Sequence, residues 1–336
     1  MRNDRPPTMA DIARKTGVSP MTVSRAFKSG GLISRETREA ILRAAEDLGY
    51  VFDSTASNLR SQKTDFIAVT IPSINNANFA DTVGALSETL TARDFQILLG
   101  YTNYDMQEEE RLIEQLLRRK PQAIVVTGGK HTLRARKLLE NANVPVIETW
   151  DAPAEPIGHF VGFSNAQAVR GMVDHFVAAG YRRIAFIGGE ASRDTRGSDR
   201  RLGFIAAVRD HGLDASRLID AGAPPISMRE GANAMARLLA EHPDTEAVIC
   251  VSDLSAFGAL TECQRRGVAV PERMAIGGFG DYEIGAVSVP ALTTIDAQAR
   301  EIGLRTGRLI LDLLDGKADV ADVTLTPQLV LRDSSR

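Results

Sequence analysis

The chain has 336 residues, of which 43% are hydrophobic and 25% charged, and its formal net charge is −3. That length accommodates one small and two medium-sized domains. No apolar run approaches the roughly 18 residues of a membrane span, and residues 1–15 are too polar for a signal peptide. We therefore expect a cytoplasmic protein, in which Cys250 and Cys263 are buried, reduced thiols rather than a disulfide or a metal site.

The charge is divided unevenly along the chain. Residues 1–63 contain 11 Lys/Arg and 7 Asp/Glu, a net charge of +4, whereas the remaining residues contain 29 and 36, a net charge of −7. A basic amino-terminal segment on an acidic body favours contact between that segment and the phosphates of nucleic acid. The same excess of charge also occurs on inert surfaces, so it does not decide the function alone.

Residues 8–25 have the pattern of two short helices joined by a tight turn. Thr8 is suited to cap the first helix, and Gly17 permits the sharp turn. Ser19 is suited to cap the second helix, with Pro20 at its first position, where a missing N–H costs nothing. The apolar positions that would pack the two helices together are Ile12, Ala13, Val18, Val23 and Ala26. The segment predicts a helix-turn-helix, and an ordinary helical hairpin is the alternative.

A third helix is expected to begin after Ser34 and to end at Gly49. Its predicted apolar face contains Ile41, Leu42, Ala45 and Leu48. The three helices together predict a small all-α head over residues 1–52.

From residue 64 onward, short apolar runs alternate with helix-length segments. This alternation predicts parallel sheets covered on both faces, in two successive units. The predicted strands are 66–71, 95–101, 123–127 and 144–148 in the first unit, then 183–188, 247–252 and 274–279 in the second. We expect the last long helix over 298–314 and a closing strand over 323–331.

Ligands of doubly wound sheets bind beyond the carboxyl ends of the strands, and the segments after the predicted strands are polar or aromatic. They predict a cleft between the two units that accepts a small polar molecule. Asp253 has the alternative role of a helix cap, and Trp150 that of a packing residue. The candidate ligand contacts from these segments are Ser73, Asn78, Phe79, Tyr101, Lys130, His131, Glu148, Trp150, Asp151, Ser252, Asp253, Phe279 and Asp281.

Residues 8–25 fill every fixed position of T-x-x-D-[IV]-A-x-x-[AT]-G-V-S-x-x-T-V-S-R, and the chain thereby resembles the LacI family of bacterial transcription regulators. The resemblance extends over roughly residues 8–332. It implies a DNA-binding head over 1–52, a hinge helix over 53–63, and a core over 64–336 that resembles periplasmic sugar-binding proteins. Within the core it implies an amino-terminal subdomain of about 64–160 plus a late crossover segment, and a carboxyl-terminal subdomain of about 164–292.

The family resemblance also implies a small effector in the cleft. The family's effector-binding arginine lies three residues before a Gly-aromatic pair, here Gly203-Phe204, which makes it Arg200. The family's G-[FY]-D-[DN] is altered to Gly278-Phe-Gly-Asp281, so an acid is missing at Gly280, which favours an anionic effector.

Five stretches are similar to the gluconate-operon repressors, a narrower group of the family. They include Lys130-His-Thr132 and Pro145-Val-Ile-Glu-Thr-Trp-Asp151. Lys130 or Arg200 would take the carboxylate of a sugar acid, and Glu148, Asp151 and Asp281 would accept from its hydroxyls. The expected effector is a sugar acid such as gluconate, with a phosphorylated sugar acid or a neutral sugar as alternatives.

The helix-turn-helix places the start of its second helix in the major groove of DNA. Pro20, Met21 and Arg25 are expected to contact bases, with Arg25 pairing with a guanine. The residues expected to contact the backbone are Thr22, Ser24, Thr37 and Tyr50, with the two caps Thr8 and Ser19 completing the set. The resemblance implies that Leu59 of the hinge wedges into the minor groove, and the chain departs from the family there, with Phe52-Asp53 in place of Pro-Asn.

The family mechanism implies a homodimer on a near-palindromic operator, with operator affinity lowered when the effector binds. A corepressor that strengthens DNA binding is the alternative. No leucine heptad follows Arg332, so a dimer is expected rather than a tetramer. The chain lacks a Gly-x-Gly-x-x-Gly, a Gly-Lys-Ser/Thr loop and a Gly-x-Ser-x-Gly, and its five histidines show no metal-ligand pairing. We therefore expect neither an enzyme nor a cofactor or metal.

Overall fold

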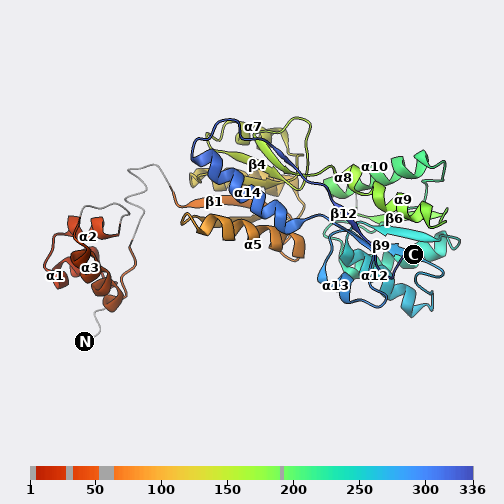
Figure 1. The fold of residues 1–336 in the computed structure, drawn as a ribbon, viewed down its shortest axis with the longest axis horizontal. Helices are drawn as coiled ribbons and strands as arrows, with labels where there is room; N and C mark the ends of the chain where they lie inside the picture. The colour runs from red at the N-terminus through yellow and green to blue at the C-terminus, as the bar shows by residue number, and fades with distance from the viewer. Residues whose placement is uncertain (1–4, 28–32, 53–63, 190–192, 336) are drawn as a thin grey trace. The chain divides into compact units, whose positions relative to one another are not determined.

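The computed structural model describes residues 5–27, 33–52, 64–189 and 193–335 (Figure 1). The chain divides into two compact units, residues 1–63 and 64–336, which are described separately below. In the described residues, no helix combines the length and apolar character needed to cross a bilayer. The predicted hinge, with Asp53 and Leu59, lies outside the described residues.

The first unit contains three helices, α1 (Met9–Thr16), α2 (Pro20–Ala26) and α3 (Arg35–Leu48). The Asp11 carboxylate accepts hydrogen bonds from Thr8 N at 3.0 Å and Thr8 Oγ1 at 2.6 Å at the start of α1. Gly17 ends that helix in the left-handed conformation, with φ of 70°. Ser19 Oγ accepts from Thr22 N at 3.1 Å, which fixes the start of α2 as predicted.

The core of this unit is small and consists of side chains from all three helices. Its fully buried members are Ile12, Ala13, Val23, Ala26, Ile41, Ala44 and Ala45. The predicted apolar face of α3 is wrong at one position, since Leu42 is 42% exposed and Ala44 is buried in its place. Residues 41, 44, 45 and 48 follow the helical repeat, and residue 42 lies about 100° away from residue 41 around the helix.

The amino-terminal subdomain of the second unit contains a six-stranded parallel sheet in the order β11-β5-β4-β3-β1-β2. Helix α14 packs along α5, although the two are far apart in sequence (Figure 1). Gly303 permits this approach, since a Cβ there would lie 2.2 Å from Thr82 O. The strands are β1 (Phe66–Ile71), β2 (Gln96–Tyr101), β3 (Ile124–Thr127), β4 (Val146–Thr149), β5 (His159–Gly162) and β11 (Val323–Thr324), and the helices α5 (Ala77–Thr91), α6 (Met106–Arg118), α7 (Leu133–Glu140) and α14 (Ala299–Leu314).

The carboxyl-terminal subdomain has a four-stranded parallel sheet in the order β7-β6-β8-β9. Helices α11 and α12 pack closely. Gly258 permits this approach, since a Cβ there would lie 1.9 Å from Met228 O. The strands are β6 (Ile184–Gly188), β7 (Leu218–Asp220), β8 (Ala247–Cys250) and β9 (Ala275–Gly277), and the helices α8 (Asn165–Ala168), α9 (Arg170–Ala178), α10 (Thr195–Asp210), α11 (Met228–Glu241), α12 (Asp253–Arg265) and α13 (Glu283–Val287). Two parallel sheets with helices between their strands confirm the predicted α/β core.

The chain crosses between the two subdomains three times. It leaves the first after β5, returns to it after β10 (Thr294–Asp296), and crosses again between β11 and β12 (Gln328–Val330). The prediction of one closing strand over 323–331 is therefore wrong. Two short strands flank Pro327, β11 in the large sheet and β12 antiparallel to β10.

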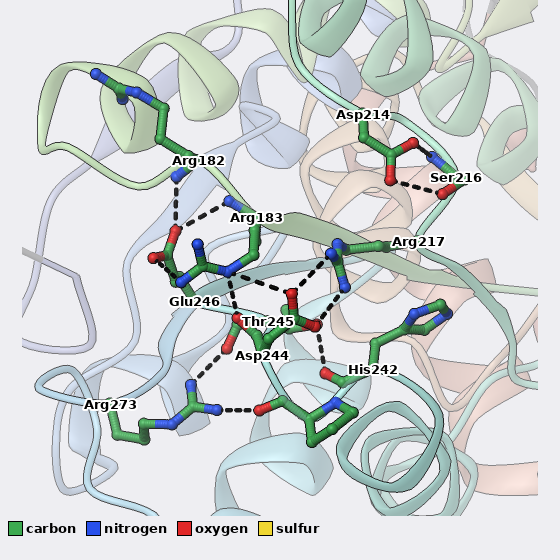
Figure 2. A network of polar contacts seen from close by, with 11 residues as sticks. Arg182, Arg183, Asp214, Ser216, Arg217, His242, Asp244, Thr245, Glu246 and Arg273 are labelled. Carbon is green, nitrogen blue, oxygen red and sulfur yellow. Dashed lines mark hydrogen bonds and ion pairs between the residues drawn. The ribbon is translucent and has the colours of Figure 1, made fainter.

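An ion-pair network joins the amino ends of the small sheet, opposite the ends where ligands of such folds bind (Figure 2). Arg217 donates to both carboxylate oxygens of Asp244, at 2.8 and 3.0 Å. Glu246 Oε2 accepts from the backbone N–H groups of Arg182 and Arg183, at 2.8 and 3.0 Å. Because these residues precede β6, β7 and β8, the network holds the strand ends in register far from the carboxyl edge.

Candidate ligand site and DNA-binding surface

A cavity of about 160 Å³ lies between the two subdomains, beyond the carboxyl ends of both sheets. Its walls combine two arginines, one carboxylate, several small polar side chains and five aromatic rings. The lining residues are Ser73, Asn75, Asn76, Asn78, Phe79, Tyr104 and Trp150 from the amino-terminal subdomain and Asp194, Arg196, Arg200, Pro224, Pro225, Ile226, Ser227, Val251, Ser252, Leu254, Phe279 and Tyr282 from the other.

Arg200 is held in the wall by three contacts. Its Nε donates to Asn165 Oδ1 at 3.0 Å and its Nη1 to Val251 O at 2.9 Å. The guanidinium carbon lies 3.6 Å from the centre of the Phe279 ring. Burial lowers the pKa of this guanidinium to about 10, so it is still a cation at neutral pH.

Arg196 lies one helical turn before Arg200 on α10 and is 6% exposed. Its Nη1 donates to Thr127 O at 3.2 Å, and its guanidinium carbon lies 5.7 Å from the Phe79 ring centre. Gly128 makes room for this group, since a Cβ there would lie 2.9 Å from Arg196 Nη1. Arg196 and Arg200 therefore both reach the cavity from one face of α10.

Asp194 is the carboxylate of the described cavity wall. Its Oδ1 accepts from Gly197 N at 2.9 Å and so caps α10. Among the described residues, no carboxylate oxygen lies within ion-pair distance of Arg196 or Arg200. Two cations and one anion leave the described wall with an excess of one positive charge, and buried charge of this kind is stabilised by a ligand of opposite sign.

Trp150 forms part of the aromatic wall and is 3% exposed. Its ring lies edge-on to Phe79, with the centroids 5.2 Å apart. Its indole N–H has no hydrogen-bond partner among the described residues. Its backbone is left-handed, with φ of 67°, a conformation that costs free energy in a bulky residue and is concentrated at functional sites.

Tyr282 reaches across the cavity from the carboxyl-terminal subdomain. Its hydroxyl donates to Asn76 Oδ1 at 2.6 Å. Gly280 has φ of 127°, and a Cβ there would lie 2.3 Å from Tyr282 Cε1 and 2.7 Å from Asn78 Nδ2. The glycine that replaces the family's acid thus leaves the space that the Tyr282 ring occupies.

The structure brings seven of the predicted ligand contacts to this cavity: Ser73, Asn78, Phe79, Trp150, Arg200, Ser252 and Phe279. It does not bring the other seven there. Tyr101 ends the edge strand β2, is 42% exposed and donates to Asn103 Oδ1 at 2.8 Å, so the cavity is lined by Tyr104 of the following loop instead.

His131, Glu148 and Glu109 form a buried cluster outside the cavity. His131 Nδ1 lies 2.9 Å from Glu109 Oε2, and its Nε2 lies 3.4 Å from Glu148 Oε1 without hydrogen-bond geometry. Glu148 Oε2 accepts from Ile157 N at 2.7 Å. Burial disfavours the charged imidazole, but the two carboxylates outweigh it and raise the pKa of His131 to about 9. The cluster is an internal ion pair rather than a ligand contact.

The remaining charged predictions also pair within the protein. Lys130 Nζ lies 2.7 and 2.8 Å from the two Asp199 carboxylate oxygens, across the cleft. Asp151 accepts from Gly129 N at 3.2 Å, and Asp281 pairs with Arg332. Asp253 is fully buried and accepts from Tyr282 N at 2.7 Å and Thr294 Oγ1 at 2.6 Å; burial raises its pKa to about 6. Its role is to hold the loop that bears Phe279 and Tyr282.

Several lining residues were not predicted from the sequence, although the positions of two of them could have indicated the cavity. Arg196 precedes Arg200 by four residues, the spacing that places two side chains on one helical face. Tyr282 follows directly on the predicted segment 279–281. No sequence pattern indicated residues 224–227, since they follow β7, which was not predicted.

Comparisons with known proteins agree with this architecture. The lacI family of bacterial regulatory proteins matches residues 8–53, and the periplasmic binding protein-like domain matches residues 173–335. The HTH-type transcriptional regulator GntR of Pseudomonas aeruginosa is 34% identical over 331 residues, or 98% of this chain and 96% of that protein. The chain belongs to the LacI family.

Solved structures of this family share the fold. A LacI family transcriptional regulator from Silicibacter pomeroyi is 42% identical, with a TM-score of 0.77 over 81% of this chain and 99% of that one. The lac repressor dimer bound to operator, at 23% identity, has a TM-score of 0.85 over 98% of this chain and 99% of that one. This LacI-family member is a helix-turn-helix transcriptional repressor with an effector-binding core, as its sequence predicts.

In the head of this LacI-family protein, the start of α2 presents an exposed surface. Pro20, Met21 and Arg25 are exposed, with Met21 at 61%. Thr22, Ser24, Thr37 and Tyr50 are half-buried, and the hydroxyls of Thr22 and Thr37 lie 2.9 and 2.8 Å from those of Ser19 and Ser34. The exposed side chains are thus free to reach bases, while the hydroxyls lie beside helix amino termini.

Proposed function

We propose that the cavity binds a sugar acid of the gluconate type and that this effector lowers the affinity of the repressor for its operator. The observation that carries the proposal is the pair of cavity arginines, the buried Arg196 and the partly buried Arg200, without an ion-paired carboxylate among the described residues. A bound carboxylate would supply the missing negative charge and accept charge-assisted hydrogen bonds. The relative named GntR supports the same assignment.

The charge of the wall favours a monoanion. One excess positive charge is neutralised by one carboxylate, whereas the phosphate of a phosphorylated sugar acid would bring about 1.5–2 further negative charges. A neutral sugar would leave the excess uncompensated. The polar groups that remain, including Ser73, Asn78 and Ser252, would bond hydroxyls, and the rings of Phe79 and Phe279 would cover the C–H faces.

The chain contains one tryptophan, Trp150, so its fluorescence reports binding in the cavity without a label. We expect gluconate or a keto-gluconate to change the emission and to raise the unfolding temperature. At a ligand concentration 100 times the dissociation constant, the free energy of unfolding should increase by about 2.7 kcal/mol. The panel includes 6-phosphogluconate, glucose and sorbitol. A response to neutral sugars alone would overturn the sugar-acid assignment.

Arg200→Ala is expected to weaken sugar-acid binding by about 10–100-fold, the equivalent of one lost charge-assisted contact. Arg201→Ala is the matched control, since Arg201 donates to Gly189 O at 2.7 Å and does not line the cavity. Equal losses in the two variants would contradict the assigned role of Arg200.

For the head, we propose that Pro20, Met21 and Arg25 contact base edges and that Leu59 contacts the minor groove. The residues proposed to contact the DNA backbone are Thr8, Ser19, Thr22, Ser24, Thr37 and Tyr50. Two copies of the chain would read the two halves of a near-palindromic operator as a homodimer.

We propose that the protein regulates transcription and does not catalyse a reaction, since the relatives are transcriptional regulators. We place it in the bacterial cytoplasm, and on the nucleoid when it is bound to DNA.

A further inference from the structure

Asn165 connects the two sides of the cavity but is absent from its lining. It is the first residue of α8, directly after the first crossover between subdomains, and is 1% exposed. Its Nδ2 donates to Trp150 O at 2.9 Å, and its Oδ1 accepts from Arg200 Nε at 3.0 Å. One amide thus bonds a residue of each subdomain.

Both partners of Asn165 are held in conformations that need support. The Trp150 backbone is left-handed, and it is fixed from both sides, since Trp150 N donates to Val161 O at 3.2 Å while its carbonyl accepts from Asn165. Arg200 is partly buried and has a long side chain with several rotamers. Its Nη2 has no hydrogen-bond partner among the described residues, so it is available to a ligand in the cavity that Arg200 lines.

An amide is suited to both bonds at this site. A carboxylate of the same length would accept from Arg200 but would face the Trp150 carbonyl with a second acceptor. An aliphatic side chain of the same volume would leave a buried N–H and a buried carbonyl unsatisfied, at a cost of about 1–3 kcal/mol each.

We propose that Asn165 is a positioning residue that sets Arg200 and Trp150 together for effector recognition. Arg200 takes the carboxylate of the effector, and the free indole N–H of Trp150 donates to one of its hydroxyl oxygens. Asn165 fixes the separation of these two groups, and with it the length of sugar acid that satisfies both. This inference rests on the proposed effector site.

The first test uses the unliganded protein. The single indole N–H of Trp150 gives one cross-peak in a ¹H–¹⁵N spectrum, and its fluorescence gives one quenching constant. Asn165→Leu is expected to displace the cross-peak and to increase acrylamide quenching at least twofold. Asn141→Leu, which removes an exposed amide bonded to Lys137 O, is the control and is expected to change neither. An unchanged Trp150 signal in Asn165→Leu would overturn the proposal, whatever ligand the cavity takes.

The second test uses gluconate as the probe. Asn165→Leu is expected to bind it at least tenfold more weakly, and Asn165→Asp to bind it weakly as well, because a carboxylate would neutralise Arg200. In an Arg200→Ala background, Asn165→Leu is expected to weaken binding by clearly less than the tenfold that it causes alone, because the part of its effect that depends on Arg200 is already lost. Fully additive losses would show a general loosening of the fold and would overturn the positioning role. Failure of the unmutated protein to bind any sugar acid would instead refute the proposed effector.

Discussion

At the scale of single residues, the cavity is distinguished by what its charged groups lack. Arg196 is buried and Arg200 partly buried, both beside aromatic rings and backbone carbonyls. The predicted charged contacts Lys130, Glu148 and Asp281 are instead already paired within the protein. Residue type and position after a strand do not distinguish these two situations, because pairing depends on side chains brought in from other elements. The resemblance to the family had singled out Arg200.

Gly280 provides a residue-scale test of effector charge. Gly280→Asp is expected to weaken gluconate binding by 100-fold or more, because it displaces the Tyr282 ring and adds a negative charge to the wall. Gly280→Ala is the control, since its methyl group has the same steric conflict without the charge. Trp150 fluorescence titration measures both. Tighter binding of gluconate by the aspartate variant than by the alanine variant would contradict an anionic effector.

Arg25 provides the corresponding test in the head. Arg25→Ala is expected to reduce the preference for operator over random DNA by about 1–3 kcal/mol, because a guanine contact discriminates between bases. Arg43→Ala, an exposed arginine of α3, is the control. Fluorescence anisotropy with operator and scrambled duplexes at one salt concentration measures the ratio. A uniform loss on both duplexes would assign Arg25 to phosphate contact.

At the scale of helices and strands, elements with a clear apolar run or helical repeat were predictable, and strands without such a run were not. The caps at Ser19, Ser34 and Gly49 and the apolar strands β1, β6 and β8 follow from local sequence. The strands β5, β7 and β10 were missed because at most two consecutive residues in each are apolar, so each is defined by its pairing with a neighbour. The cavity segment 224–227, which follows β7, was lost with that strand.

The His131 cluster joins α6, β4 and the loop after β3, and it predicts a pH dependence. The raised pKa of His131 means that its stabilising contribution is complete below about pH 6.5 and is lost as the pH rises through about 9. We expect the free energy of unfolding to fall over this interval, by at most about 1.4 kcal/mol per pH unit. His131→Gln should abolish this fall in the free energy of unfolding with pH, whereas His159→Gln, at a partly exposed site, should leave it unchanged. Chemical denaturation at several pH values decides; equal slopes in His131→Gln and the unmutated protein would contradict the assignment.

At the scale of the whole core, several polar contacts between described residues join the subdomains across the cleft. They include the Lys130–Asp199 ion pair, the Arg196 bond to Thr127 O, the Tyr282 bond to Asn76 and the Arg193 bond to Asn103 O. Since Arg196 and Tyr282 line the cavity, a ligand there competes with or reinforces the contacts that set the angle between the subdomains. Binding and subdomain arrangement are thereby coupled.

Variants of the Lys130–Asp199 ion pair test this coupling without changing a residue of the cavity wall. Because Lys130 is half-exposed, Lys130→Met is expected to cost only about 0–1 kcal/mol of stability. It is expected to change gluconate affinity severalfold, because it alters the balance between open and closed arrangements. The charge-exchanged double variant Lys130→Asp with Asp199→Lys should restore the affinity. A double variant no better than the single ones would contradict a role for the pair.

The central claim, that a sugar acid in the cavity releases the operator, is tested most directly by measuring operator affinity with and without gluconate. The duplex is a near-palindromic site selected in vitro by the purified protein, and anisotropy is read at fixed salt. We predict that gluconate weakens operator binding by about 5–150-fold, the usual range of allosteric coupling, and that Arg200→Ala binds the operator normally but does not respond. Unchanged or tighter operator binding in the presence of gluconate would contradict the account.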